Sequence, residues 1–309
     1  MRNQTILNEF FLSGLSDLPS LRLPLFLFFL LIYVLTIIWN LLIITLIIMD
    51  SHLHTPMYFF LGNLASLDLC SSSVTIPQML FDLHTKRKII SRTACLTQFF
   101  FFDSFSSSEV FLLSVMSYDR FNAICHPLHY MQIMHWKVCV QFACIVWLLG
   151  FIYSLIQTLG SSRLTFCGSN IVESFFCDLP QLLQISCSDI YINVLLIFLF
   201  GGLFGGGCLT MTILPYVHII KTVQKLQQKG NTSKVFSTCS SHVSLVFIFY
   251  GTLIFNYFRP SGSYHFATSK VVSVFYTAIL PLLNPLIYSL RNQEFKIALR
   301  AAAMKMHYS

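Results

Sequence analysis

An adjacent acid and base, Asp119 and Arg120, stand at the end of a long apolar run. An ionised side chain at membrane depth costs about 2.5–3.5 kcal/mol, so such groups are usually paired or near water, and they mark function. Asp119 can hold Arg120 by a charge-assisted contact. Because arginine stays charged, the contact is released by protonating Asp119 or by giving Arg120 another partner. The pair is either a switch or a snorkelling pair that only marks a membrane boundary.

Four further polar residues interrupt apolar surroundings, namely Asn40, Asp68, Glu109 and Asn284. Two acids in one bundle should not both be ionised without a cation or a shared proton. Pro285, directly after Asn284, removes a helix hydrogen bond and creates a pivot. These residues form either a network that changes during activation or a hydrogen-bonded polar core that fixes helix register.

The ten cysteines divide into two groups. One group falls in apolar spans or on the inner side, where thiols stay reduced; its members are Cys70, Cys125, Cys139, Cys144, Cys208 and Cys239. Cys95, Cys167, Cys177 and Cys187 gather on the other side, and an even set predicts disulfides and an oxidising compartment. Four cysteines allow three pairings, and the residues alone leave all three open. These four cysteines could also bind zinc, but they lack the closely spaced ligand pairs that are typical of zinc sites.

The elements that must position these residues are membrane helices. The chain of 309 residues is 55% hydrophobic and 10% charged, whereas soluble domains average about 25% charged residues. Backbone polar groups cannot stay unpaired in hydrocarbon, so apolar runs of about 20 residues predict helices. We predict an all-α membrane protein, a bundle of seven spans at Leu23–Met49, Pro56–Leu80, Leu96–Tyr118, Val138–Leu159, Ile190–Ile220, Val235–Phe258 and Val271–Leu290.

This organisation divides the chain into an N-terminal segment (1–22), the bundle (23–290) and a tail (291–309). An odd number of spans places the termini on opposite sides of the membrane. Lysine and arginine counts, ten against nine, do not set the orientation, so we take it from the cysteines and from the N-glycosylation sequon at Asn3, which favour an outer N-terminus. The first apolar run is too long for a signal-peptide core and should be an uncleaved anchor. Basic residues are scattered over short loops, which gives no nucleic-acid signal.

The stretch Met116–Tyr130, MSYDRFNAICHPLHY, resembles the third-helix signature of vertebrate olfactory receptors, a rhodopsin-like G-protein-coupled receptor family. The family's usual form is MAYDRYVAICHPLRY, and eleven of the fifteen positions match. The departures are Ser117, Phe121, Asn122 and His129. Two later stretches also resemble the family: KVFSTCSSH, starting at Lys234, and PLLNPLIYSLRN, starting at Pro281.

The resemblance implies specific structural features. It pairs Cys95 with Cys177 and Cys167 with Cys187, and it predicts a short amphipathic eighth helix after the seventh span. It also implies that Asp68 and Glu109 face each other and could share a sodium ion; no other cofactor is expected. The residues expected to serve activation and G-protein coupling are Asp119, Arg120, Phe121, Tyr216, Lys234, His242, Asn284, Pro285 and Tyr288. Cys239 and His242 share a helical face, but two ligands are too few for a metal site.

The resemblance also predicts a ligand pocket in the outer halves of the third, fifth and sixth spans. Its expected lining is Phe102, Asp103, Ser106, Ser107, Phe200, Phe204, Leu253 and Tyr257. An apolar, aromatic lining with a few hydroxyls suits a small volatile molecule. Amine receptors of the wider superfamily carry an acid at the position of Phe102, so a biogenic amine is not supported. Five glycines between Gly201 and Gly207 could allow close helix approach, leave room for a ligand or soften the helix.

We therefore expect an odorant receptor of the plasma membrane that raises cyclic AMP through a stimulatory G protein. Its partners are a small volatile odorant, that G protein and membrane lipid. A transporter or channel that uses Asp68 and Glu109 as an ion path is the alternative, but the chain has no visible internal repeat or ring of charge. An enzyme is not expected, because no catalytic triad, zinc-protease motif or phosphate loop is present.

Overall fold

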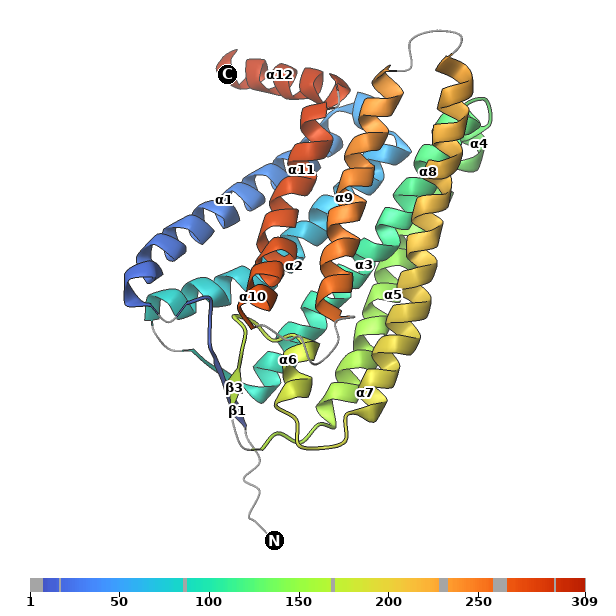
Figure 1. Cartoon of the computed structure of the whole chain (residues 1–309). Helices are drawn as coiled ribbons and strands as arrows, with labels where there is room; N and C mark the ends of the chain where they lie inside the picture. Colours follow the sequence, from blue (N-terminus) through green and yellow to red (C-terminus); the bar gives the residue numbers. More distant parts are fainter. Residues whose placement is uncertain are drawn as a thin grey trace.

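The computed structural model is a bundle of long helices with a small sheet at one end (Figure 1). It describes residues 8–16, 18–85, 88–167, 170–227, 233–257, 266–291 and 293–308. Within these ranges the backbone alone is described at 223, 225–227, 233–242, 257, 266–268, 288–291, 293, 302–303 and 305–308. The N-terminal strand and the C-terminal helix lie at opposite ends of the bundle.

Seven helical segments cross the bundle. The first four are α1 (Pro19–Met49), α2 (Pro56–Thr85), α3 (Arg92–Cys125) and α5 (Trp136–Ser162). The fifth segment is built from α7 (Tyr191–Leu196), η2 (Ile197–Gly205) and α8 (Gly206–Gln227), and the sixth is α9 (Ser233–Tyr257). The seventh joins α10 (Phe266–Val274), η4 (Phe275–Ile279) and α11 (Leu280–Arg291). Short helices η1 (Ser51–Leu53), α4 (Tyr130–Ile133) and α6 (Leu179–Gln184) lie in connecting loops.

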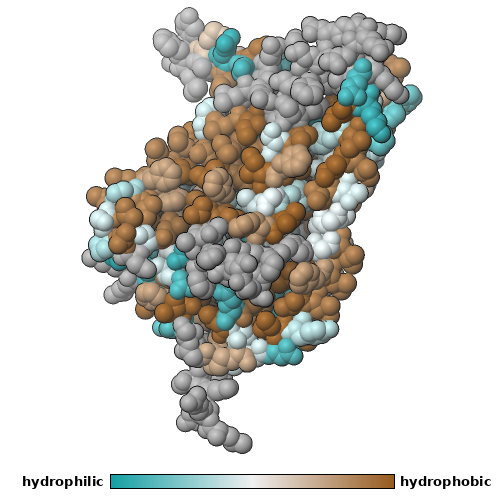
Figure 2. All heavy atoms as spheres, viewed as in Figure 1, coloured by the Kyte–Doolittle hydropathy of each residue, from teal (hydrophilic) through white to brown (hydrophobic). Residues whose placement is uncertain are grey.

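The length and hydropathy of these helices suit a bilayer. Six described segments are long and apolar enough to cross a membrane, and Val243–Asn256 of α9 is a shorter apolar helix. Large apolar side chains such as Leu27, Ile48, Leu148 and Phe247 are exposed on the outside of the bundle. Figure 2 shows that apolar residues cover most of the middle of the visible face. The predicted seven-span organisation is confirmed, and most helices extend a few residues beyond the apolar runs that predicted them.

Two spans contain π-helical segments that the apolar pattern did not predict. In the fifth span, η2 covers the start of the glycine-rich run, and in the seventh, η4 precedes the Asn284–Pro285 pair. A π segment adds a residue to a helical turn and is frequent at functional sites. Both segments lie in helices whose side chains also line the cavity described below.

The end of the bundle at which the N-terminal strand lies carries a three-stranded sheet that the sequence did not predict. We call this end the outer end and the opposite end the inner end. Strand β1 (Glu9–Leu12) lies between β2 (Ile89–Ser91), with which it is antiparallel, and β3 (Ile171–Val172), with which it is parallel. Phe10 of β1 packs edge-on against Phe166, with ring centroids 4.9 Å apart. The N-terminal segment is therefore fixed to the loops before the third span and after the fourth.

The predicted eighth helix is present as α12 (Gln293–Tyr308), which runs across the inner end of the bundle (Figure 1). Phe295 and Ala298 are buried, whereas Glu294, Lys296 and Ile297 are exposed. The Tyr58 hydroxyl donates a hydrogen bond to Glu294 Oε2 at 3.1 Å. These contacts join α12 to the inner end of α2.

Helices α3 and α5 approach each other closely at Gly150. A Cβ atom at this position would lie 2.7 Å from the Ser104 carbonyl oxygen and 2.8 Å from the Ser108 backbone nitrogen, and would also meet the Ser108 hydroxyl. Small residues allow the backbones of membrane helices to approach closely. Van der Waals contact then stabilises the helix pair, because the hydrophobic effect does not favour helix association within lipid. Gly150 therefore fixes the separation of these two spans.

We predict that Gly150→Val lowers the thermal stability of the protein strongly, because backbone atoms cannot move aside as a flexible side chain can. Overpacking typically costs about 1–3 kcal/mol and more where the backbone must shift. Fluorescence-detected thermal unfolding of the detergent-solubilised protein measures the effect. Gly62→Ala is the control, because its added Cβ meets its nearest neighbour at an ordinary 3.6 Å. Equal stability of the two variants would contradict the role given to Gly150.

Candidate functional site

The outer loop is held over the bundle by two disulfides. Cys95 at the start of α3 is bonded to Cys177, and Cys167 is bonded to Cys187, with Cα–Cα distances of 5.4 and 5.9 Å. Among the described cysteines, the free ones are Cys70, Cys125, Cys139, Cys144 and Cys208. The structure therefore contains the two pairings that the family resemblance implied, and the first attaches the loop to the third span.

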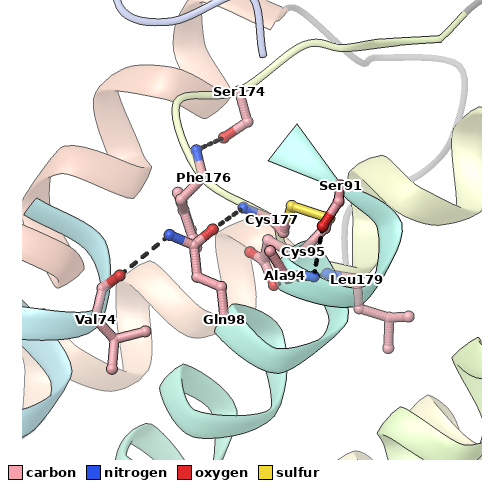
Figure 3. Close-up of a disulfide and its surroundings, with 10 residues drawn as sticks. Val74, Ser91, Ala94, Cys95, Gln98, Ser174, Phe176, Cys177 and Leu179 are labelled. Atoms are coloured by element: carbon pink, nitrogen blue, oxygen red, sulfur yellow. Dashed lines mark hydrogen bonds between the residues drawn. A yellow bond between two sulfur atoms is a disulfide. The ribbon is translucent and has the colours of Figure 1, made fainter. Parts of the chain in front are cut away.

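Gln98 strengthens this attachment one turn along α3 (Figure 3). Its side-chain oxygen accepts a hydrogen bond from the Cys177 backbone nitrogen at 2.9 Å, and its amide nitrogen donates to the Val74 carbonyl oxygen at 3.1 Å. One buried side chain thus joins the loop, α3 and α2.

The residue after Cys177 connects the loop to the sixth and seventh spans. Buried Asp178 accepts hydrogen bonds from Asn256 Nδ2 of α9 at 3.0 Å and from the Tyr276 hydroxyl of η4 at 2.9 Å. It also accepts from the Leu179 backbone nitrogen at 2.8 Å. Sequence reasoning missed this cluster, although an acid beside a loop cysteine and an asparagine inside an apolar span were both visible signals.

A cavity of about 340 Å³ lies between the third, fifth and sixth spans, with one wall residue each from the fourth and seventh spans. Cavities that hold small ligands are typically about 300–1,000 Å³ and mostly apolar. Seven of the eight residues predicted to contact ligand are in its wall: Phe102, Asp103, Ser106, Ser107, Phe200, Phe204 and Leu253. The side chain of the eighth, Tyr257, lies outside the described residues. Contact between these residues and a ligand stays a prediction.

The remaining wall residues were not predicted. Val110 and Phe111 lie four positions after Ser106 and Ser107, on the same face of α3, so helical spacing could have found them. The others come from four spans and required the three-dimensional arrangement: Tyr153, Ile197, Gly201, Gly202, Gly205, Gly206, Leu209, Tyr250, Ile254 and Tyr276.

The structure favours one of the three interpretations of the glycine-rich run. Gly201, Gly202, Gly205 and Gly206 line the cavity. A Cβ atom at Gly202, Gly205 or Gly206 would have no neighbour within 4 Å. These glycines therefore leave open space beside the cavity, and Gly202, Gly205 and Gly206 do not bring two helices into close contact.

The buried acids meet at one amide deeper in the bundle. Asn284 Nδ2 donates to Asp68 Oδ1 at 3.0 Å and to Glu109 Oε1 at 3.0 Å. Asn40 Nδ2 donates to the Pro281 carbonyl oxygen at 3.0 Å, which adds the first span to the seventh. We call Asn40, Asp68, Glu109 and Asn284 the polar hub. Neither acid forms an ion pair within the described part of the chain.

The inner end holds the predicted acid–base pair. Arg120 donates through Nε and Nη2 to Asp119 Oδ2, with the Nε distance at 3.0 Å, and Asp119 is 1% exposed. The Tyr130 hydroxyl donates to the other oxygen, Asp119 Oδ1, at 2.8 Å. Burial and the adjacent Asp119 carboxylate raise the pKa of the Tyr130 hydroxyl, which therefore stays protonated as the donor. We call Asp119, Arg120 and Tyr130 the inner lock; sequence reasoning missed Tyr130.

Two other predicted activation residues, Tyr216 and Phe121, lie near the lock. Tyr216 of α8 is buried near Phe121 and Ile124 of α3. Pro215, which stands beside it, lies within α8 and does not end the helix. Pro285 is buried within α11. The side chains of Lys234, His242 and Tyr288, and all of Asn3, lie outside the described residues.

Comparison with known proteins decides the family. The family profile described as "Olfactory receptor" matches residues 29–305. The chain belongs to the olfactory receptor family.

Its relatives extend over nearly its whole length. This olfactory receptor is 47% identical to Olfactory receptor 5B12 of Homo sapiens over 99% of its own chain and 97% of that protein. It is 46% identical to Olfactory receptor 4E2 of Mus musculus, over 96% of each chain. The crystal structure of squid rhodopsin aligns with a TM-score of 0.66 at 18% identity, covering 94% of this chain and 87% of that one. This likeness shows the seven-span receptor fold.

Family and fold together identify a multi-pass membrane receptor that responds to small molecules and couples to a G protein. The expectation that the chain is not an enzyme is confirmed by its family.

We predict that Gly205→Leu weakens the response of this olfactory receptor to its larger ligands by about tenfold or more, because leucine adds apolar volume to the cavity wall without a clash in the helix. Dose–response curves over a series of ligands of increasing size measure the shift. Gly207→Leu is the control, because Gly207 has equal free space but lies outside the cavity wall. A similar shift in both variants would show a general effect on the helix.

Proposed function

We propose that this olfactory receptor binds small volatile molecules in the cavity beneath its outer loop and activates a stimulatory G protein, which raises cyclic AMP. The observation that carries the proposal is the cavity itself, which is walled by α3, α5, η2, α8, α9 and η4. The loop that is disulfide-bonded to α3 contacts this wall, because Phe176 packs against Phe102 and Asp178 accepts a hydrogen bond from Tyr276. The inner lock lies at the opposite end of α3.

The ligand class follows from the chemistry of the cavity wall. Aromatic and aliphatic side chains dominate it, with the carboxyl of Asp103 and the hydroxyls of Ser106 and Ser107 as polar exceptions. An apolar site with a few polar groups binds apolar molecules and uses the polar groups to orient them. Small volatile odorants have this chemistry.

The orientation in the membrane is part of the proposal. Both disulfides and the N-terminal strand β1 lie at one end of the bundle. Disulfides persist in oxidising compartments, so we place this end outside the plasma membrane, with glycosylation at Asn3. The tail, with α12, then lies in the cytoplasm beside the inner lock.

Signal transfer requires that ligand binding favours a second arrangement of the bundle. A ligand shifts such an equilibrium only if it binds one state better than the other. Within the described residues, the cavity and the lock are joined along α3 and α8: Ser114 Oγ lies 3.0 Å from Thr212 Oγ1, and Ser117 Oγ donates to the Thr212 carbonyl oxygen at 2.7 Å. A shift of α8 against α3 would alter these contacts and reach Tyr216 and Phe121 one turn further inward.

The inner lock supplies the coupling step. In the resting arrangement, both Asp119 oxygens are occupied, one by Arg120 and one by Tyr130. When helix movement separates these groups, the permanently charged guanidinium needs another partner. A polar or acidic surface of the G protein can provide it, and Lys234 and His242 at the inner end of α9 are proposed to contact the same surface.

The polar hub fits a sodium ion. Two buried acids converge on the single amide of Asn284, and no described basic side chain neutralises them. Carboxylate oxygens suit a hard cation, and a cation would allow both acids to stay ionised. We propose that Asp68 and Glu109 hold the ion, which would supply positive charge at the hub.

We predict that Arg120→Ala abolishes odorant-stimulated cyclic AMP while the receptor still reaches the cell surface, because the guanidinium makes contacts at the inner end and none with the cavity wall. A cyclic-AMP reporter with surface labelling of an N-terminal tag measures both quantities. Arg163→Ala, which removes an exposed arginine at the outer end, should respond normally. Full signalling by surface-expressed Arg120→Ala would contradict the role of the lock.

A further inference from the structure

One carboxyl oxygen in the cavity wall is left without a hydrogen-bond partner. Asp103 of α3 is 9% exposed, and its Oδ2 atom is buried and accepts no hydrogen bond in the described part of the chain. A buried polar atom without a partner costs free energy, and in native structures it usually has a functional explanation. Asp103 lines the cavity, so a bound molecule can supply the missing partner.

The neighbouring polar groups do not satisfy this acid. The Ser154 hydroxyl of α5 lies near the Asp103 carboxyl and donates to the Phe100 carbonyl oxygen at 2.7 Å. The Tyr153 hydroxyl accepts a hydrogen bond from Gln157 at 3.2 Å. Asp178, the other acid nearby, accepts hydrogen bonds from Leu179, Asn256 and Tyr276.

We propose that Asp103 selects ligands that carry a hydroxyl group, namely small apolar alcohols, with the hydroxyl bound between Asp103 and Ser107. This inference rests on the proposed function. Asp103 and Ser107 are four positions apart on α3 and both line the cavity, so they are neighbours on one helical face. The ligand hydroxyl donates to the Asp103 carboxyl and accepts from the Ser107 hydroxyl.

A hydroxyl fits this position better than other polar groups. It is both a donor and an acceptor, so it bonds to a carboxylate and also to a protonated carboxyl. An ether only accepts, and an ammonium group only donates and needs several acceptors. The rest of the wall is mainly aromatic and aliphatic, which would leave an ammonium group poorly solvated and suits the carbon skeleton of an alcohol.

The test compares matched probes on the full-length receptor in cells with a cyclic-AMP reporter. Each carbon skeleton (linear, branched, monoterpene and aromatic) is supplied as the alcohol, an ether isomer, the primary amine and the hydrocarbon. Aldehydes and ketones complete the panel. Receptor variants are Asp103→Leu, which removes the carboxyl, and Asp103→Asn, which keeps its shape. Asp189→Asn, at an exposed acid outside the cavity wall, is the control.

We expect at least one alcohol to be roughly ten- to hundredfold more potent than its ether isomer, the range for a hydrogen bond to a charged or strongly polar group. Asp103→Leu should reduce the alcohol to the potency of the ether, Asp103→Asn should keep part of the difference, and Asp189→Asn should keep all of it. If Asp103→Leu does not reach the cell surface, Asp103→Ser replaces it in the test. This variant also removes the carboxyl, and its side chain is smaller and less apolar than leucine.

Several results would overturn the inference and leave the proposed function standing. These are ethers or hydrocarbons as potent as alcohols, amines more potent than alcohols, activation by aldehydes or ketones alone, or an alcohol preference that persists without the carboxyl. Failure of the proposed function would give a different result, because a surface-expressed receptor would then respond to no volatile of any class. That result would reject the proposed function and this inference together.

Discussion

The contact on which the bundle most depends is the Asn284 amide with its two carboxyl partners. It joins α2, α3 and α11 at one point, and Asn40 adds α1 through the Pro281 carbonyl oxygen. Lipid tails are as apolar as leucine, so the hydrophobic effect gives little attraction between spans, and close packing and interhelical hydrogen bonds must replace it. The polar hub and the tight approach at Gly150 meet this requirement, and together they fix α3 as the central helix that carries both the cavity wall and the inner lock.

The same constraint explains where the receptor can change shape. Polar contacts between spans, such as those of Asn284 with Asp68 and Glu109, hold the neighbouring helices at fixed positions. The cavity wall on the fifth span is different, because its glycines have free space beside them and its backbone is π-helical. A ligand in this cavity would therefore meet a fixed wall on α3 and an open wall on the fifth span. We infer that movement of the fifth span relative to α3, through Ser114, Ser117 and Thr212, is the step that carries ligand binding inward.

Sequence reasoning predicted the parts of this arrangement that local chemistry determines. Apolar run length predicted seven spans, and charge inside apolar surroundings identified Asp68, Glu109 and the Asp119–Arg120 pair. The sequence could not predict that Asp178, Asn256 and Tyr276 form a hydrogen-bonded cluster. These residues are 20 to 98 positions apart, and only the packing of the helices brings them together. Nor could the sequence predict strand β1, whose pairing with two distant loops depends on the disulfide-held outer end. The glycine run allowed three interpretations until its surroundings were visible.

The central claim is that a ligand in the outer cavity drives nucleotide exchange at the inner end. The most direct measurement uses the purified receptor in a lipid bilayer with a purified stimulatory G protein, and follows the rate of nucleotide release from the G-protein α subunit with and without an activating odorant. The account predicts that the odorant accelerates release from the stimulatory protein, and that an otherwise identical assay with an inhibitory G protein shows little change. Unchanged release in the presence of a bound odorant, or equal acceleration of both G proteins, would contradict it.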